Sequence, residues 1–264
     1  MNNAALWEDY HSGKQTYVQL ARKYGCSVRT IQRRLDQVLV TNESPEPRSV
    51  VVLMDTTYFG RRFGVMVFKD ALSGENLLKT YVKYETNQLY QAGIAELTRR
   101  GYKIQAIVCD GRRGLLTQFS EVPVQMCQFH QIAIITRYLT RNPKTPASVQ
   151  LREIVSKLPK TTRSKLELAI NEWEKRWNDF INERTKDPET NKTRYTHKRL
   201  RSALRSLKTN LQWLFTFEDY PDQNIPNTTN AIDGQFANLK SKLRNHNGLS
   251  IDRRKKFIDE FLKA

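Results

Sequence analysis

The sequence predicts an α/β protein in which a mixed β-sheet is preceded by a small helical unit and interrupted by a long helical insertion. Three observations support this prediction. Short runs of β-branched residues alternate with helical patterns between residues 50 and 140, residues 141–220 carry apolar residues at helical spacing, and residues 1–40 read as short helices. A chain of 264 residues is long enough for one good-sized domain with a smaller one attached.

Residues 1–40 are expected to form a helix-turn-helix unit. Helices are predicted over residues 4–11 and 18–24, and a third begins after Ser27, a residue type that caps helix N-termini. Gly25 falls in the turn between the second and third helices. The outward side of the third helix offers side chains suited to phosphates and base edges, namely Arg29, Thr30, Gln32, Arg33 and Arg34. The unit is therefore predicted to bind DNA, the alternative being a basic helical hairpin that serves only for packing.

A polar stretch with two prolines predicts a linker over residues 41–49. Beyond it, strands are expected over residues 50–54, 63–69, 77–84, 104–109 and 122–127, with helices over residues 87–100, 113–119 and 129–139. This order, three consecutive strands followed by alternating helices and strands, is the RNase H-like arrangement. We expect the core to comprise residues 50–140 and 221–264, where the last two helices lie over residues 228–244 and 251–262.

Residues 141–220 are predicted to be an all-helical insertion into this core. Their apolar positions repeat at helical spacing, and residues 187–192 form the expected loop. Residues 141–210 hold 18 Lys and Arg against 8 Asp and Glu, so the outer faces of these helices are basic.

The whole chain is strongly basic, with 44 Lys and Arg against 27 Asp and Glu and a formal net charge of +17. Such an excess attracts polyanions, because each neutralised phosphate releases condensed counterions, so nucleic acid is the first partner to consider. A basic protein without a nucleic-acid partner, or a membrane-surface binder, is the alternative. No apolar run is long enough to span a membrane, no secretion signal is visible, and the three cysteines are too scattered for a disulfide framework, so a cytoplasmic protein is expected.

Two of the predicted strands end in an aspartate, Asp55 and Asp110. The carboxyl ends of neighbouring buried strands converge on one edge of an α/β sheet, so these carboxylates are expected to face each other. Hard oxygen ligands suit Mg²⁺, and a pair of such ions stabilises both the attacking and the leaving oxygen in phosphodiester chemistry. Two carboxylates are too few for two ions, and Asp233, early in the helix after the insertion, is the preferred third ligand.

Each of these aspartates, taken singly, could be an ordinary turn or cap residue. Other acids compete for the third position, but they lie in turn-like sequence: Asp70, Glu218, Asp219 and Asp222.

Three further residues are candidates to support the acids. Cys127 and His130 stand three residues apart at a strand-to-helix junction, and we expect a hydrogen-bonded His130 beside the acids. The alternative is a zinc site, which needs four ligands and would have to recruit His197 or His246. Asn230 lies three residues before Asp233, so on a helix it faces the same way and could orient a carboxylate or a phosphate.

The C-terminal segments are rich in basic residues that are better suited to phosphate contacts than to catalysis. They are Arg244, Arg253, Arg254, Lys255 and Lys256. A solvated basic helix face is the alternative interpretation.

Four segments, in this order, resemble the successive signatures of the Mutator-like insertion-sequence transposases, which have a DDE/D active site. They are Val51-Val-Leu-Met-Asp55, Val108-Cys-Asp-Gly-Arg-Arg-Gly-Leu115, Cys127-Gln-Phe-His130 and Asn227-Thr-Thr-Asn-Ala-Ile-Asp-Gly234. The resemblance covers residue 50 to the C-terminus. It implies an RNase H-like fold with a helical insertion between the second and third acids, and a catalytic triad of Asp55, Asp110 and Asp233. The family more often has glutamate at the third position.

The same resemblance implies an activity and partners. A transposase of this family cleaves and transfers strands at the ends of its element, using Mg²⁺ or, as the alternative, Mn²⁺. Its expected partners are double-stranded DNA, both element ends and target, and a second copy of the chain bound to paired ends. Two other interpretations stay open: a catalytically inactive or domesticated DNA-binding protein, and an RNase H-like nuclease without strand transfer.

Overall fold

The computed structural model describes residues 1–41, 45–246 and 248–263. Residues 42–44, in the middle of the expected linker, and Asn247 lie outside this description. The chain divides into two compact units, one comprising Met1–Pro47, Thr56–Glu85 and Asn230–Ala264, the other Arg48–Asp55 and Thr86–Thr229. We refer to them as the first and second units and describe each by itself.

The sheet is five-stranded and mixed, with strand order β3-β2-β1-β4-β5. Its strands are β1 (Ser49–Phe59), β2 (Phe63–Asp70), β3 (Asn76–Val82), β4 (Lys103–Cys109) and β5 (Val124–Met126). β2 pairs with β3 in antiparallel fashion, whereas β4 pairs in parallel with both β1 and β5. Three consecutive strands followed by parallel crossovers confirm the RNase H-like fold. β1 passes from the second unit into the first directly after Asp55.

The first unit contains the three N-terminal helices and the two last helices. Its helices are α1 (Asn3–His11), α2 (Tyr17–Lys23), α3 (Val28–Gln37), α10 (Asn230–Arg244) and α11 (Ile251–Phe261). Ser27 caps α3 as expected, because its side chain accepts a hydrogen bond from the amide of Thr30. Gly25 has a φ of 61° in the turn between α2 and α3, a conformation that glycine adopts without strain.

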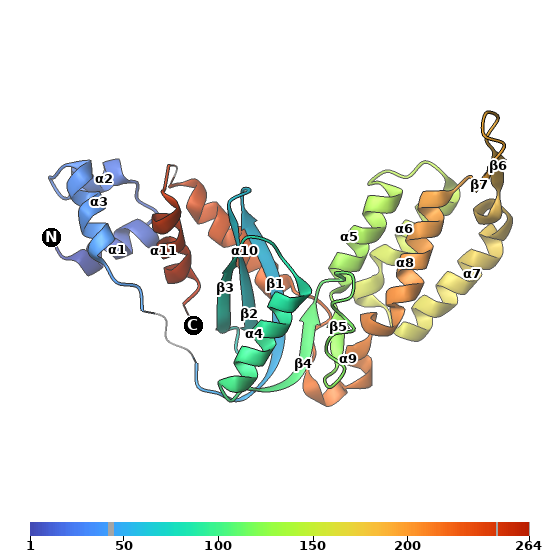
Figure 1. The fold of residues 1–264 in the computed structure, drawn as a ribbon, viewed down its shortest axis with the longest axis horizontal. Coiled ribbons are helices and arrows are strands. Elements are labelled where there is room, and N and C mark those ends of the chain that lie inside the picture. Colours follow the sequence, from blue (N-terminus) through green and yellow to red (C-terminus); the bar gives the residue numbers. More distant parts are fainter. Residues whose placement is uncertain (42–44, 247, 264) are drawn as a thin grey trace. The chain divides into compact units, whose positions relative to one another are not determined.

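Helix α11 lies beside α1–α3 in this unit (Figure 1). Arg253 forms an ion pair with Asp36 at 2.7 Å, and the ammonium group of Lys256 donates to the carbonyls of Leu35 and Asp36. On the sheet side, the hydroxyl of Tyr81 donates to the Lys255 carbonyl at 3.0 Å. Helix α11 is thus joined both to the end of α3 and to strand β3.

The second unit combines the parallel strands with the insertion. Its helices are α4 (Asn87–Arg99), α5 (Gln128–Leu139), α6 (Pro146–Ser156), α7 (Arg163–Asn182), α8 (Lys198–Leu214) and the short α9 (Thr216–Asp219), with 3₁₀ turns at Leu158–Lys160 and Pro221–Gln223. Helices α5 to α8 run alongside one another (Figure 1). Trp173 is buried among them, and its indole donates to the Ala147 carbonyl at 3.0 Å. None of the helices in the described part of the chain is both long and apolar enough to span a membrane.

Two details differ from the sequence predictions. Residues 113–119 form turns instead of a helix, because Gly114 takes a φ of 76°, which an α-helix cannot accommodate. The insertion is helical except for one antiparallel hairpin, β6 (Arg184–Lys186) and β7 (Thr193–Tyr195), closed by the expected loop. Its strands are almost wholly exposed, so no alternation of apolar and polar residues marked them in the sequence.

Two buried histidines lie where α1 and α11 meet. The rings of His11 and His246 pack against Phe257, with centroids 4.5 and 5.1 Å away, and neither Nε2 atom has a hydrogen-bond partner among the described residues. Burial, reinforced by nearby Lys242, lowers the pKa of His11 to about 4, and burial also lowers the pKa of His246. Both imidazoles are therefore neutral in the folded protein near neutral pH.

We expect acid to destabilise the first unit through His11. Its pKa falls from 6.5 in the unfolded chain to about 4 in the folded one. The unfolded chain therefore binds the proton first, and the stabilisation is complete above the unfolded pKa and is lost as the pH falls from about 6.5 to about 4. The loss should be on the order of 2–3 kcal/mol, since one pKa unit corresponds to about 1.4 kcal/mol.

Urea unfolding followed over this pH range measures the effect. His11→Phe should flatten the pH dependence, whereas His197→Gln, on the hairpin side of the second unit, should leave it as in the wild type. An unchanged pH dependence in His11→Phe would contradict the assignment.

Candidate metal centre at the edge of the sheet

The parallel pairing of β1 with β4 sets the positions of the first two acids. Leu53 is in register with Val108. Asp55 and Asp110 each follow two residues later, at matching positions, and both side chains are half-buried. Both carboxylates also act on the same neighbours, since each raises the pKa of His130 and of the Cys109 thiol. The second unit thus brings Asp55 and Asp110 to one edge of the sheet.

The turn after β4 holds the Asp110 carboxylate. Its Oδ1 atom accepts a hydrogen bond from the amide of Arg112 at 3.1 Å. The backbone of Gly111 lies against Met126, a fully buried residue of β5, whose terminal methyl would be 2.1 Å from a Cβ at this position. The chain after Asp110 therefore packs directly against β5, which keeps this carboxylate at the edge.

Cys127 and His130 lie beside these acids at the junction of β5 and α5. The Sγ atom of Cys127 accepts two hydrogen bonds of 3.3 Å, from the amide and the hydroxyl of Thr229. Burial raises the pKa of the Cys127 thiol, but the bonds from His130 and Thr229 outweigh it, so that the net pKa is lowered. The contact with Cys127 raises the pKa of His130 to about 9. Both acids also raise this pKa, whereas burial lowers it. The sulfur of Cys127 and the ring of His130 thus favour each other's charged forms.

His130 also has an unused ring nitrogen. Its Nδ1 atom is buried and has no hydrogen-bond partner among the described residues. A carboxylate oxygen of Asp55 and a ring nitrogen of His130 lie within 4.8 Å of each other. Buried polar atoms are rarely left without a partner, so this nitrogen marks a place where a further group would be accommodated. Carboxylate oxygens are ligands that divalent metals accept, whereas the protonated ring of His130 offers a hydrogen-bond donor at this place.

Residues 227–229 are fastened to the start of α5. The amide of Gln128 donates to the Asn227 carbonyl at 3.0 Å, and the Asn227 side chain donates to the Gln128 side chain at 3.0 Å. Together with the two Thr229 bonds to Cys127, these contacts fix the segment that directly precedes α10. Sequence reasoning missed the roles of Asn227 and Thr229, because partners 99 and 102 residues away leave no local signal.

Asp233 and Asn230 are both exposed in the first turn of α10, which belongs to the first unit. The competing acids are engaged in other contacts. The Asp70 carboxylate accepts bonds from the Leu72 amide and the Ser73 hydroxyl in the turn after β2. Asp219 pairs with Arg163 at 2.6 Å, Glu218 accepts a bond from the Arg163 amide, and Asp222 is exposed in a 3₁₀ turn.

The two histidines considered for a zinc site have other environments. His197 pairs with Glu183 at 2.8 Å and stacks on Phe180 at a centroid distance of 3.7 Å. His246 packs against Tyr10 and Phe257 in the first unit. Each ring is thus held by neighbours other than Cys127 and His130.

The residues expected to contact DNA fall into two groups. On α3, Arg29 and Arg33 are exposed, Thr30, Gln32 and Arg34 are half-exposed, and Arg34 donates to the Met1 carbonyl at 2.8 Å. On α11, Arg253 and Lys256 hold the end of α3, and the ammonium group of Lys255 lies 4.9 Å from the centre of the Tyr81 ring. Arg244 is exposed and Arg254 is half-buried.

The comparisons with known proteins identify no family. No family model matches the sequence, and no curated protein matches it. Solved structures with some likeness include a Drosophila P element transposase strand transfer complex, with 12% identity over 99% of this chain and 91% of that chain and a TM-score of 0.48. The HTLV-2 integrase catalytic core domain in complex with magnesium has 16% identity over 58% of this chain and 96% of that chain, with a TM-score of 0.26.

A simian T-cell lymphotropic virus intasome, in complex with a PP2A regulatory subunit, has 13% identity over 76% of this chain and 68% of that chain, with a TM-score of 0.25. All three TM-scores are below 0.5. The RNase H-like fold is therefore assigned from the order and direction of the strands in this chain.

We expect the raised pKa of His130 to depend on Cys127. Cys127→Ser removes the ionisable sulfur while keeping a small polar side chain, and the pKa of His130 should then fall from about 9 toward its ordinary value of 6.5. NMR titration of the histidine ring signals measures this shift, and Cys26→Ser, in the helix-turn-helix, is the matched control. In the wild type, the stabilisation that accompanies the raised pKa of His130 should be complete below about pH 6.5 and be lost as the pH rises through about 9. The lowered pKa of the Cys127 thiol contributes in the opposite sense, with a stabilisation that is lost as the pH falls.

Proposed function

We propose that this protein is a DNA transposase of the Mutator-like insertion-sequence type, which cleaves DNA strands at the ends of its element and joins them to target DNA. The observation that carries this proposal is the matching placement of Asp55 and Asp110, each two residues beyond the paired residues Leu53 and Val108 of two parallel strands. The order of the four sequence segments and the net charge of +17 support it.

The donor set fits Mg²⁺, with Mn²⁺ as the alternative. Half-buried carboxylates at the edge of the sheet are hard oxygen ligands, and the buried, unpartnered Nδ1 atom of His130 leaves a polar place beside them. Asp55, Asp110 and Asp233 would hold the ions, which when bound would activate the attacking oxygen and stabilise the leaving one. The imidazolium of His130 balances the negative charge of the carboxylates and of Cys127, and offers a donor to a scissile phosphate.

Asp233 is the third ligand in this proposal because of what precedes it in the chain. It stands four residues after Thr229, which is bonded to Cys127. On a helix, four residues span about 6 Å, so Asp233 starts within reach of the junction that holds His130. Asn230 lies on the same first turn, where it would orient a carboxylate or a DNA phosphate.

The remaining parts of the chain have assigned roles in this proposal. The exposed face of α3 would recognise the element ends, with Arg29 and Arg33 its most accessible cations. Arg244 and Arg254 would contact backbone phosphates, and Arg253, Lys255 and Lys256 would hold α11 in place as well. The active form would be a homodimer on paired ends, and the free cysteines suit the cytoplasm.

We expect Asp55→Asn and Asp110→Asn to abolish Mg²⁺-dependent cleavage. Each substitution keeps the shape of the side chain and removes the charge that binds the metal. Because changes to outer-shell partners alone cost roughly 10–100-fold, losing a direct ligand should lower the rate by more than about 100-fold. The assay follows strand cleavage and joining of a plasmid that contains the gene with its own flanking DNA.

Asp222→Asn is the matched control, because this exposed acid lies outside the proposed triad and should leave both reactions unchanged. Cleavage that is as fast in Asp110→Asn as in the wild type would refute the proposal. DNA binding without any cleavage by the wild type would identify the inactive DNA-binding protein, and cleavage without joining would identify a nuclease.

The third position allows a separate prediction. Asp233→Glu adds one methylene but keeps the charge, so it should retain metal-dependent cleavage within about tenfold of the wild type, whereas Asp233→Asn should lose more than about 100-fold. Equal rates in Asp233→Asn and the wild type would exclude Asp233 as the third ligand. That result would not bear on the roles of Asp55 and Asp110.

A further inference from the structure

The insertion contains a basic cavity that plays no part in the proposed metal centre. It has a volume of 590 Å³ and lies between the end of α5, the loop that leads to α6, strand β7 and the start of α8. Four cationic side chains line it, Lys144, Arg194, Lys198 and Arg199, and its described lining residues include no carboxylate. A cavity in which cations are lining residues and carboxylates are not favours an anionic occupant.

A second cavity of 510 Å³ adjoins the first. It shares Tyr138, Lys198 and Arg199 with the first cavity and adds Arg137. The guanidinium of Arg199 donates to the Arg137 carbonyl at 3.0 Å, which ties the start of α8 to the end of α5. The two cavities therefore form one continuous basic surface, with Lys198 and Arg199 in both. We call it the basic track, and its cations are Arg137, Lys144, Arg194, Lys198 and Arg199.

The start of α8 adds to the positive charge of this track. No side chain caps its first turn, and that turn contains no acidic residue. The unpaired amides of a helix N-terminus carry partial positive charge, and cations such as Lys198 and Arg199 at that position repel it. A bound phosphate would satisfy the amides and the cations together.

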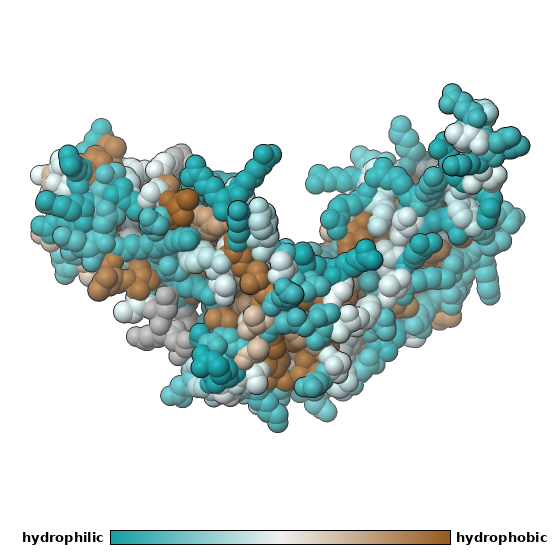
Figure 2. Space-filling view, in the orientation of Figure 1, coloured by the Kyte–Doolittle hydropathy of each residue, from teal (hydrophilic) through white to brown (hydrophobic). Residues whose placement is uncertain are grey.

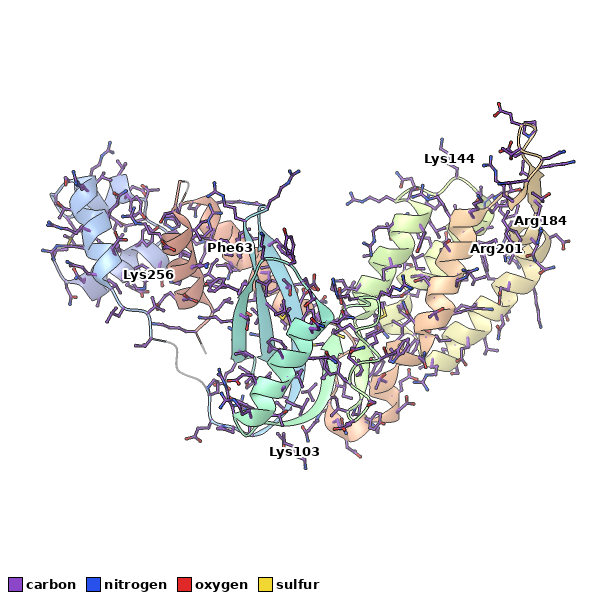
Figure 3. All side chains as sticks on the ribbon, viewed as in Figure 1. Phe63, Lys103, Lys144, Arg184, Arg201 and Lys256 are labelled. Carbon is purple, nitrogen blue, oxygen red and sulfur yellow. The ribbon has the colours of Figure 1, made fainter. Side chains whose placement is uncertain are left out.

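Side-chain contacts of Tyr195 stabilise the hairpin beside the track. The ring of Tyr195 lies between the guanidinium groups of Arg184 and Arg201, at 4.5 and 3.7 Å, and its hydroxyl accepts a bond from Arg184. Figure 3 labels Arg184 on β6, Arg201 on α8 and Lys144 on the loop that leads to α6. The surface over the hairpin and the neighbouring ends of α5 and α8 is hydrophilic in Figure 2.

Two acids of the hairpin region, Glu183 and Asp187, have partners of their own. Glu183 pairs with His197, and Asp187 lies 4.0 Å from Arg194 and accepts amide bonds in the hairpin loop. These acids therefore do little to neutralise Lys144, Lys198 and Arg199.

We propose that this basic track binds the sugar–phosphate backbone of DNA, at a site separate from both the metal centre and the helix-turn-helix. The inference rests on the proposed function for one point only, namely that the polyanion is DNA. Two adjoining hollows suit successive phosphates of one strand, and the partly exposed ring of Tyr138 between them can pack on a sugar or a base.

The test uses the full-length Asp110→Asn protein, in which cleavage is disabled, and a fluorescent duplex of one fixed length. The double variant Lys144→Gln/Lys198→Gln, called the track variant, removes two positive charges from the track. Arg199 is kept because its guanidinium donates to the Arg137 carbonyl. Lys165→Gln/Lys175→Gln removes two exposed charges from α7 and is the matched control. Thermal unfolding of each variant verifies that the fold is kept.

Binding is measured over a range of salt concentrations. The track variant should bind at least about tenfold more weakly, and the slope of log affinity against log salt should fall by about two, because two DNA phosphates are no longer neutralised by lysine. The control variant should change affinity less than about threefold. Equal effects of the two variants would overturn the proposal, because they would show a response to net charge alone.

Two further arms separate the possible outcomes. If inorganic pyrophosphate binds the Asp110→Asn protein through Lys144 and Lys198 while the track variant binds DNA normally, the site is for a free phosphate compound and the proposal fails. In the protein with Asp110 intact, the track variant should raise KM for cleavage and leave kcat unchanged. A chain that cleaves nothing would refute the proposed function, yet the difference in DNA affinity would still support the track.

Discussion

The parallel hydrogen bonding between β1 and β4 is the constraint on which the candidate site depends. Register in a sheet is set in steps of one residue, and a slip of one residue turns a side chain to the opposite face. The pairing of Leu53 with Val108 therefore decides that Asp55 and Asp110, each two residues farther along the chain, lie at the same level of the sheet. The continuous apolar residues of both strands, buried on both faces, hold that register.

A second layer of contacts builds on this edge. Cys127, the first residue after β5, is bonded through its backbone amide to the Cys109 carbonyl at 2.8 Å and through its sulfur to Thr229. One residue thus joins the end of β4, the start of α5 and the segment that leads into α10. The sulfur and the imidazole of His130 each favour the charged form of the other, so their protonation states belong to the pair as a whole.

Much of the fold could be predicted from local pattern, because buried strands and amphipathic helices leave periodic signals. The strand order and the N-cap at Ser27 are examples. The end of β1 lies farther along the chain than predicted. The sequence predicts a strand over residues 50–54, because polar Thr56 and Thr57 interrupt the apolar run, whereas β1 continues to Phe59. The hairpin of the insertion was missed because exposed strands have no apolar face.

The supporting contacts of the site could not be predicted in this way. Thr229 reaches Cys127 across 102 residues, and Arg253 reaches Asp36 across 217, distances over which sequence periodicity conveys nothing. Asp55 and Asp110 could be recognised because each follows a run of apolar residues and carries a carboxylate, a group that binds divalent metals. The roles of neutral side chains such as Asn227 emerge only once the chain is folded.

The bonds between α11 and α3 bear on how strongly the protein attracts a polyanion. Arg253 is neutralised by Asp36, and Lys256 is occupied by two backbone carbonyls. Arg163 and Lys79 are likewise matched by Asp219 and Asp259. Internal partners such as these leave fewer than the 44 Lys and Arg side chains available to neutralise phosphates, so fewer counterions are released on docking than the number of basic residues alone suggests.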